Sequence, residues 1–461
     1  MIGDIPRTIG FDELDARYRQ LRAGGMREPA YGGPLSRHLG SGDRRMLRLR
    51  YDNSAAAIRL WNFLLTEEDR LHAARAQGKK IVGVMKDLGT AAVMAYSLPD
   101  VVAFYPDGAW WLPCIMEMSA GLLRIADSLG IDESFCPVRA MLGAFMNEAH
   151  FPLPDLLICS VGATCDDFSA IAQRLDGLGH PILWWEVPHR RGPDATEAGV
   201  RLPGGFVAPR GQVEFVAGEL RRVRAALEDL TRQKLDDRRL AEGIRLANRA
   251  RRLLRELRRT AFTAAAAPMP ALEMLIAEML AIHYCSDSAE APVVLGDLLA
   301  EARRRADAGA GVLDTEAVRV FWVNPVADLR VMNLLEESGG RVCGTDYLFC
   351  HAIDEIPEDV EPMEALARMA LADPMVGSAA DRASRICADI RDFGSEAVVI
   401  SAIPGASHCA MEGTVIAEYI RSRMALPVVE LEVPPLTDSM QPTLRTRLEA
   451  LVEIAKERRE S

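Results

Sequence analysis

The chain has 461 residues, 49% of them hydrophobic, and a formal net charge of −12. This length predicts two or three lobes with a sizeable packed core. The acidic excess argues against nucleic acid as a partner, because no basic face balances it. The arginine-rich stretch 216–259 carries interleaved Glu and Asp at helical spacing, which is typical of a solvated helix.

The first twenty residues, MIGDIPRTIGFDELDARYRQ, lack the apolar core of a secretory signal. The longest apolar runs are of strand length or are interrupted by Gly, Pro or charge, so the sequence predicts no membrane span. The nine cysteines form no small-domain disulfide framework. We therefore expect a cytoplasmic protein whose reduced thiols are free to bind metal.

The first part of the chain changes from helical to alternating patterns. Residues 1–75 are polar-rich and amphipathic, and predict a helical N-terminal region. Short apolar runs then alternate with helix-length segments, which is the βαβ pattern of a mostly parallel sheet. We expect a first α/β lobe over 76–208, with strands at 81–85, 101–105, 156–161 and 181–187.

Residues 209–315 have a long helical pattern, and strand-length runs return after it. We expect a second α/β lobe over 316–461, with strands at 318–324, 341–347, 397–403 and 427–433. The predicted fold class is α/β, with two Rossmann- or flavodoxin-like parallel-sheet lobes, a helical N-terminal region and a helical insertion between the lobes.

Three cysteines lie where predicted strands give way to turns or helices. Cys165 follows the strand at 156–161, and Cys409 follows the strand at 397–403. Cys136 precedes a helix, whose N-terminal amides would favour a thiolate. Ligands of open α/β sheets gather beyond the carboxyl ends of the strands. Three soft thiolates there suit an iron–sulfur cluster, and a [4Fe–4S] cube with three protein ligands keeps one iron open.

Other polar residues near these cysteines are weaker candidates. Glu117 lies at a loop-to-helix junction and is either a base or substrate anchor or a plain helix-start carboxylate. His408, beside Cys409, is a candidate proton donor or hydrogen-bond partner of the cluster. Asp166 and Asp167 open a predicted helix, which favours a role as N-terminal charge stabilisers.

Cys114, at a predicted helix start, is an alternative fourth ligand that would close the open iron. The other cysteines have contexts typical of buried structural thiols, and none has a standard metal-binding spacing. They are Cys159, Cys285, Cys343, Cys350 and Cys387. The chain contains neither G-x-x-x-x-G-K-[ST] nor G-x-S-x-G, so ATP hydrolysis would have to belong to another protein.

Five segments together resemble one family. They are the CPV segment at Cys136, the TCD segment at Cys165, the Cys409 loop followed by ALPVVELEV, the middle stretch LDDRRLAEGIRLANRARRLLREL and the final LRTRLEALVEI. From about residue 76 to the C-terminus the chain resembles the D-component of the 2-hydroxyacyl-CoA dehydratase and benzoyl-CoA reductase family. It departs from the family pattern at Arg139, in the GASH sequence before Cys409, and in its tryptophan-rich segment before Cys114.

The resemblance implies that Cys136, Cys165 and Cys409 hold a [4Fe–4S] cluster between the two lobes. It also implies a related second subunit, in a hetero- or homodimer, and an ATP-dependent iron–sulfur activator that supplies single electrons. The implied substrate is an acyl-CoA. One electron on its thioester carbonyl gives a ketyl radical anion, which expels the neighbouring hydroxyl.

The sequence leaves several functions open. The chain is expected to be a subunit of a radical (R)-2-hydroxyacyl-CoA dehydratase, which is a lyase. The alternatives are a subunit of an ATP-dependent benzoyl-CoA or other acyl-CoA reductase, a double-cubane-cluster reductase, and a non-catalytic electron-relay subunit. The acyl group, and whether this chain or its partner binds it, also stay open.

Overall fold

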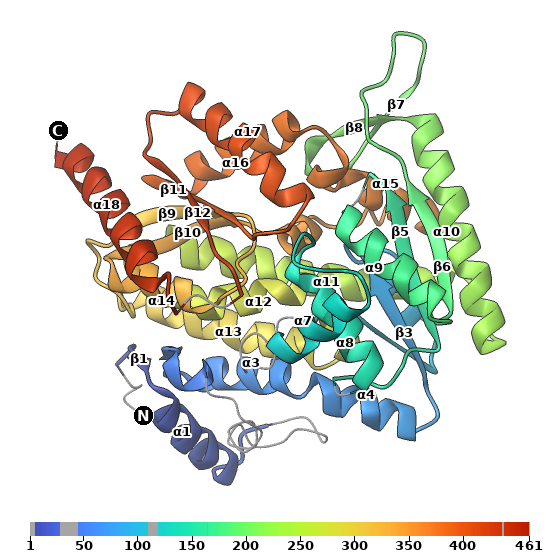
Figure 1. Ribbon diagram of the computed structural model, residues 1–461, viewed down its shortest axis with the longest axis horizontal. Coiled ribbons are helices and arrows are strands. Elements are labelled where there is room, and N and C mark those ends of the chain that lie inside the picture. Colours follow the sequence, from blue (N-terminus) through green and yellow to red (C-terminus); the bar gives the residue numbers. More distant parts are fainter. Residues whose placement is uncertain are drawn as a thin grey trace.

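The computed structural model describes residues 5–27, 45–108, 119–148, 150–163, 165–435 and 438–460. Two four-stranded parallel sheets form two α/β lobes, and long helices pack against both of them (Figure 1). The predicted fold class is therefore confirmed. Within the described residues, no helix combines the length and the apolar character needed to cross a membrane.

Both sheets have the same topology. The first has the strand order β4-β3-β5-β6, and the second has the order β10-β9-β11-β12. When the strands of each lobe are numbered by their order in the chain, their spatial order in the sheet is 2-1-3-4, as in flavodoxin-like folds. All eight strands were predicted to within about one residue at each end. They are β3 (Lys80–Met85), β4 (Val101–Phe104), β5 (Leu156–Gly162), β6 (Ile182–Val187), β9 (Val318–Val323), β10 (Gly340–Asp346), β11 (Ala397–Ala402) and β12 (Val428–Glu432).

Two antiparallel pairs were not predicted, because their strands are too short to show a periodic pattern. β1 (Thr8–Ile9) pairs with β2 (Tyr51–Asp52), and β7 (Gly199–Arg201) pairs with β8 (Val207–Pro209). The second pair lies in a stretch whose Pro, Gly and charge content indicates a loop.

Helices surround both sheets. The N-terminal region contains α1 (Phe11–Ala23), η1 (Arg45–Arg48), α3 (Ala55–Leu65) and α4 (Glu67–Ala76). The helices of the first lobe are α5 (Ala91–Tyr96), α7 (Ser119–Ser128), η2 (Pro137–Arg139), α8 (Ala140–Asn147) and α9 (Asp166–Gly177). The second lobe has α14 (Arg330–Glu337), η5 (Leu348–Ile353), α15 (Pro362–Ala372), η6 (Pro374–Val376), α16 (Ala379–Phe393), α17 (His408–Arg423) and α18 (Gln441–Glu460).

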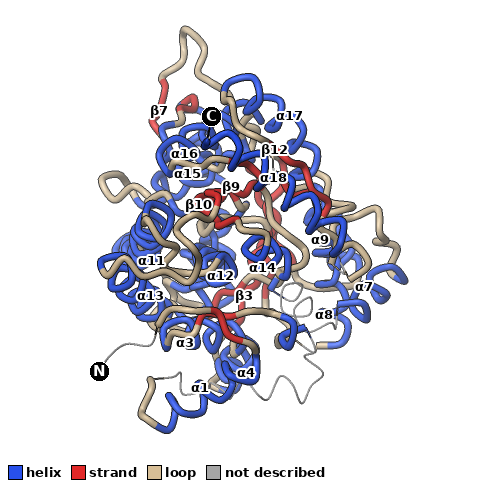
Figure 2. Tube along the Cα trace, turned by 90° about the vertical axis from the view of Figure 1, so that its left-hand side faces the viewer, coloured by secondary structure: helices blue, strands red, loops and turns tan. Residues whose placement is uncertain are grey.

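The helices between the lobes connect them physically. They are η3 (Pro203–Gly205), α10 (Arg210–Thr231), α11 (Asp237–Thr263), α12 (Ala271–His283), η4 (Tyr284–Asp287) and α13 (Ala291–Asp307). Figure 2 shows α11 and α13 on one side of the molecule and α7, α8 and α9 on the other. α11 contacts both α5 and β10. Its buried Arg251 donates hydrogen bonds to the carbonyl oxygens of Leu88 (3.1 Å) and Asp354 (2.7 Å), one from each lobe.

A buried carboxyl group joins the N-terminal region to this helical layer. Glu273 of α12 is fully buried, and its Oε1 accepts hydrogen bonds from Trp61 Nε1 (2.9 Å) and the backbone N–H of Asp52 (3.0 Å). Burial, and after it the charge of Asp52, raise the pKa of Glu273 from 4.5 to about 8. The group is therefore protonated in the folded chain at neutral pH.

This pKa predicts how stability depends on pH. The stabilising contribution of Glu273 is fully present below pH 4.5 and is lost as pH rises toward about 8. This is because Glu273 loses its proton at a lower pH in the unfolded chain than in the folded chain. Glu273→Gln has no such proton, so its stability relative to the wild type should rise across this window by at most about 1.4 kcal/mol per pH unit. Denaturant unfolding from pH 5 to 8 measures this difference.

Glu301→Gln is the control for this measurement. Burial raises the pKa of Glu301, but Arg304 and Arg305 outweigh it and leave the pKa below its usual value. The Glu301→Gln difference should therefore be constant from pH 5 to 8. A Glu273→Gln difference that is equally constant would contradict the protonated assignment.

Candidate functional site

A cavity of about 120 Å³ lies between the two lobes. Its walls come from the segments that follow the first three strands of each sheet in chain order, around the positions where the strand order reverses. Open α/β sheets bind their ligands at these reversal points. The residues that these segments contribute include Lys86 after β3, Tyr105 after β4, Cys165 after β5, Pro325 after β9, Leu348 after β10 and Ile403 after β11.

Two of the predicted cysteine ligands line this one cavity. The side chains of Cys136 and Cys165 are half-buried, and both reach the cavity. Cys165 is the N-cap residue of α9, and Cys136 is the N-cap residue of η2, which leads into α8. Burial raises the pKa of Cys165, against the opposing effects of the charge of Lys86 and the N–H groups of the first turn of α9.

Asp167 holds the segments around these cysteines together. It is buried in the first turn of α9, and its Oδ1 accepts a hydrogen bond from the backbone N–H of Cys136 (3.2 Å). Its Oδ2 accepts hydrogen bonds from the N–H (2.9 Å) and the hydroxyl (2.8 Å) of Ser407 in the other lobe. The Cys165 thiol also lies 3.7 Å from Oδ2. One carboxylate thus joins three segments that are far apart in sequence.

The Ser407 segment leads directly to the third predicted ligand. Ser407 is the residue before α17, and Cys409 is the second residue of that helix. Gly405, in the same loop, has φ of +81°, and a Cβ there would lie 2.5 Å from the carbonyl oxygen of Phe135. Only glycine permits this close approach to the backbone beside Cys136. The start of α17 therefore lies against the Cys136 loop.

Lys86 brings a positive charge to the cavity. It is the first residue after β3, and its φ of +52° places a non-glycine residue in the left-handed region. Asn324, the first residue after β9 in the second lobe, also has a left-handed backbone, with φ of +69°. Such strained residues concentrate at functional sites. The charge of Lys86 opposes the burial that raises the pKa of Cys165, and it assists His351 in lowering the pKa of Asp373 against burial.

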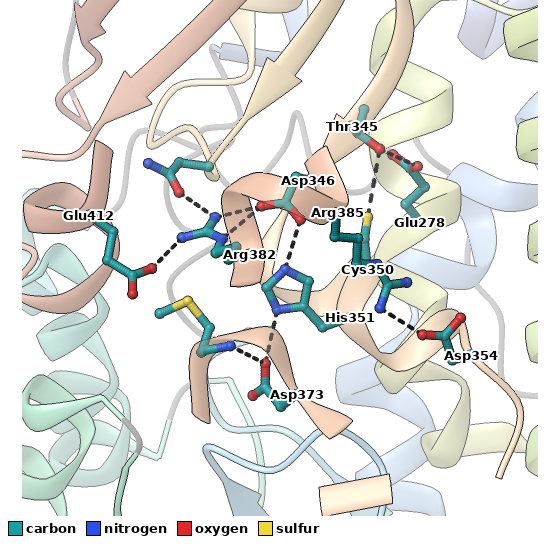
Figure 3. A network of polar contacts seen from close by, with 12 residues as sticks. Glu278, Thr345, Asp346, Cys350, His351, Asp354, Asp373, Arg382, Arg385 and Glu412 are labelled. Carbon is teal, nitrogen blue, oxygen red and sulfur yellow. Dashed lines mark hydrogen bonds and ion pairs between the residues drawn. The ribbon is translucent and has the colours of Figure 1, made fainter. Parts of the chain in front are cut away.

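A buried ionic network fixes the wall of the second lobe (Figure 3). His351 lies between two carboxylates, with Nε2 2.9 Å from Asp346 Oδ1 and Nδ1 3.0 Å from Asp373 Oδ1. Burial lowers the pKa of His351, but Asp346 and Asp373 outweigh it, so the net pKa is raised and favours the imidazolium. Arg382 then links Asp346 Oδ2 (2.7 Å) to Glu412 of α17 (2.8 Å). The network thereby connects Asp373, on the cavity wall, to the helix that begins beside Cys409.

The remaining predicted site residues lie wholly or partly outside the described part of the chain. Glu117 and Cys114 lie outside the described residues. The backbone of His408 and Cys409 begins α17, but their side chains are outside the description. Among the side chains that are described, no group of three or more His, Cys, Asp or Glu residues is arranged to hold a metal ion. The ligand role of the three cysteines therefore stays a prediction.

Sequence reasoning missed several residues of the site. Asp167 was interpreted as a helix-start charge, and its contacts to Cys136 and Ser407 depend on a tertiary approach that no local pattern encodes. Lys86 and Asp107 could have been found, because each lies within three residues of the carboxyl end of a predicted strand.

Replacing Asp167 tests its role as the link between these segments. Asp167→Asn keeps Oδ1 for Cys136 but places an amide donor against the N–H of Ser407. We expect a loss of about 3 kcal/mol of stability, since two hydrogen bonds to a charged acceptor are removed. Cys136 and Cys165 should also react faster with a thiol reagent in this variant. Denaturant unfolding and the rate of thiol modification measure the two effects.

Asp166→Asn is the matched control, because Asp166 is the exposed neighbour on the same helix turn. It should leave both the stability and the thiol reactivity close to those of the wild type. Equal effects of the two substitutions would show that Asp167 acts only as a helix-start charge.

Comparison with known proteins agrees with the resemblance read from the sequence. Residues 101–455 match the sequence model of the 2-hydroxyglutaryl-CoA dehydratase D-component. No curated protein matches the chain. The matched region contains both sheets apart from β3, and all three segments that Asp167 joins. The chain therefore belongs to the 2-hydroxyglutaryl-CoA dehydratase D-component family, and is a subunit of the 2-hydroxyacyl-CoA dehydratase type.

Proposed function

We propose that this chain is the iron–sulfur subunit of a radical (R)-2-hydroxyacyl-CoA dehydratase. The observation that carries the proposal is the link made by Asp167, which brings the Cys136, Cys165 and Ser407 segments to one cavity. Cys409 lies two residues beyond Ser407, in the first turn of α17. In this proposal Cys136, Cys165 and Cys409 are the ligands of a [4Fe–4S] cluster.

The chemistry of the donor set fits such a cluster. Soft thiolates are the usual ligands of iron–sulfur centres, and both described cysteines of the set line the cavity. The N-terminus of α9 directs backbone N–H groups toward Cys165, and the ammonium group of Lys86 opposes the burial that raises the pKa of that thiol. These positive charges and N–H donors would stabilise an anionic metal–thiolate group. When bound, the cluster would supply single electrons and a Lewis-acidic iron.

The other cavity residues have separate tasks in the proposed reaction. Apolar side chains from both lobes, including Val138 and Phe168 of the first and Ile403 of the second, would exclude water from the reacting group. The His351 network holds Asp373 and the neighbouring wall in one position. Glu117 remains a proposed base or substrate anchor, and His408 a proposed proton donor or hydrogen-bond partner of the cluster.

The proposal also includes partners. The D-component name implies a second subunit, and we expect a related chain in that position. Since the sequence has no phosphate-binding loop for ATP, a separate ATP-hydrolysing iron–sulfur activator would supply the electron. The ligand in the cavity would be an acyl-CoA thioester. A cytoplasmic location follows as part of the same proposal.

The ligand assignment can be tested by metal analysis. After anaerobic reconstitution, the wild-type chain should contain about four irons and about four sulfides. Cys136→Ser, Cys165→Ser and Cys409→Ser should each lose most of this content, because one of three protein ligands is removed. Cys387→Ser is the control, since Cys387 is a buried thiol of α16 away from the cavity. Full iron content in the Cys409→Ser variant would overturn the assignment.

Electron paramagnetic resonance of the same samples separates the alternative functions. An acyl-CoA that perturbs this chain's signal supports substrate binding here, whereas a change only in the partner subunit supports an electron relay. About eight irons and about nine sulfides per dimer would indicate the double-cubane alternative. Product analysis separates a dehydratase, which releases an enoyl-CoA, from a reductase, which adds hydrogen to the acyl group.

A further inference from the structure

One part of the cavity wall carries polar groups that have no role in the proposed function. Tyr105 and Asp107 follow β4 directly, and both line the cavity. Tyr105 is 3% exposed. Its hydroxyl oxygen and Asp107 Oδ1 are buried, and neither has a hydrogen-bond partner among the described residues. Unpaired buried polar atoms are costly, so their presence indicates a ligand that completes them.

The other carboxylates of the cavity are already occupied. Asp87 accepts hydrogen bonds from the backbone N–H groups of Thr90 (2.8 Å) and Ala91 (2.7 Å). Asp167 is held by the Ser407 segment, and Asp373 is held by His351 and the N–H of Met375. Among the described carboxylates of this cavity, Asp107 alone has a buried oxygen without a hydrogen-bond partner.

The surroundings of Asp107 place its pKa near neutral pH, where the carboxyl can both release and accept a proton. Burial raises its pKa to about 7, against the opposing effect of the N–H groups of Asp107 and Gly108. His283 Nε2 of α12 lies 3.8 Å from Oδ1, which is too long for a hydrogen bond. Burial lowers the pKa of His283, so its ring is neutral and does not hold Asp107 ionised. The other titratable and charged groups around this part of the wall are Glu67 and Arg70 of α4, Lys86 and Asp87 after β3, Tyr105, Arg251 of α11, and Tyr284 and Cys285 of η4.

From this geometry, and resting on the proposed function, we infer that Asp107 is the proton-transfer residue for a 2-hydroxyacyl thioester in the cavity. Tyr105 donates a hydrogen bond to the same bound group. A neutral carboxyl and a neutral phenol suit an uncharged hydroxyl or carbonyl oxygen, because neither introduces a second buried charge. The apolar residues of the cavity exclude water that could otherwise exchange the proton.

Asp107 can carry out both proton transfers of the reaction. As the bond between C2 and the hydroxyl oxygen breaks, the oxygen keeps the electron pair and takes the proton of the Asp107 carboxyl, so water leaves. The resulting carboxylate then accepts the proton from C3, and the electron pair of that C–H bond completes the new double bond. A low-potential one-electron donor supplies an electron before the first step and recovers it after the second. The net reaction is loss of water, and Asp107 ends protonated.

Infrared difference spectroscopy on the reconstituted full-length enzyme tests this role, with 2-hydroxyglutaryl-CoA as the added probe. In the wild type, the probe should shift the C=O band of a protonated carboxyl group, and Asp107→Asn should lack that band. Glu336→Gln is the control, because Glu336 of α14 is another carboxyl whose pKa is raised by burial, to about 8, but it lies outside the cavity. Its band should not respond to the probe.

Kinetics of the same variants provide the second measurement. Asp107→Asn should lower kcat by about 100-fold or more with a small change in KM, and should abolish the pH dependence near neutrality. Asp107→Glu should restore part of kcat. Tyr105→Phe, which deletes only a hydroxyl, should raise KM about fivefold. Tyr96→Phe is its control. The Tyr96 hydroxyl forms hydrogen bonds with the carbonyl oxygen of Gly243 and the hydroxyl of Tyr284, and Tyr96 does not line this cavity.

The outcomes separate this inference from the proposed function. If the probe perturbs the iron signal while Asp107→Asn keeps kcat within about threefold and the carboxyl band does not respond, the role of Asp107 is overturned and the proposed function stands. If calorimetry detects no binding of 2-hydroxyglutaryl-CoA, or of 2-hydroxyacyl-CoA thioesters with other acyl groups, to the wild-type enzyme, both are overturned. If Asp107→Asn does not fold, an unchanged KM in Tyr105→Phe overturns the inference.

Discussion

The arrangement of this site depends on the carboxylate of Asp167. It accepts hydrogen bonds from Cys136 in its own lobe and from Ser407 in the other lobe. Cys165 is the N-cap residue of the helix that carries Asp167. A buried carboxylate is stable only when its oxygens are hydrogen-bonded, and here those partners are backbone groups beside the cysteines. The interaction that satisfies Asp167 therefore also sets the separation of the cysteine segments and the position of one lobe against the other.

The two lobes reach this arrangement through the same topology. Each sheet has the order 2-1-3-4, so each has its reversal point beside its first and third strands. These two points face one cavity, and residues from both lobes line it. Arg251 of α11 and the His351 network hold the lobes and the cavity wall from other directions. A rigid cavity between two lobes suits chemistry that must exclude water and keep a reacting group in place.

The sequence predicted the sheets well because their signal is local. The strands at 156–161 and 397–403 are apolar runs bounded by turns, and they form β5 and β11. Cys136 and Cys165 were identified from their positions at strand and helix ends, and the structure places both on one cavity. The roles of Asp167 and Asp107 were not identified. That of Asp167 depends on the approach of Ser407 from the other lobe, and that of Asp107 depends on a buried oxygen that no described group contacts. Periodicity and spacing carry no information about such contacts.

The central claim is that the Cys136, Cys165 and Cys409 segments surround one iron–sulfur cluster between the lobes. An anaerobic crystal structure of the reconstituted chain, with anomalous differences measured across the iron absorption edge, tests it most directly. The claim predicts one iron peak in the cavity, bounded by the N-termini of α9 and α17 and by the Cys136 loop. Iron bound elsewhere on the chain, or a cluster without the Cys409 thiolate as a ligand, would contradict it.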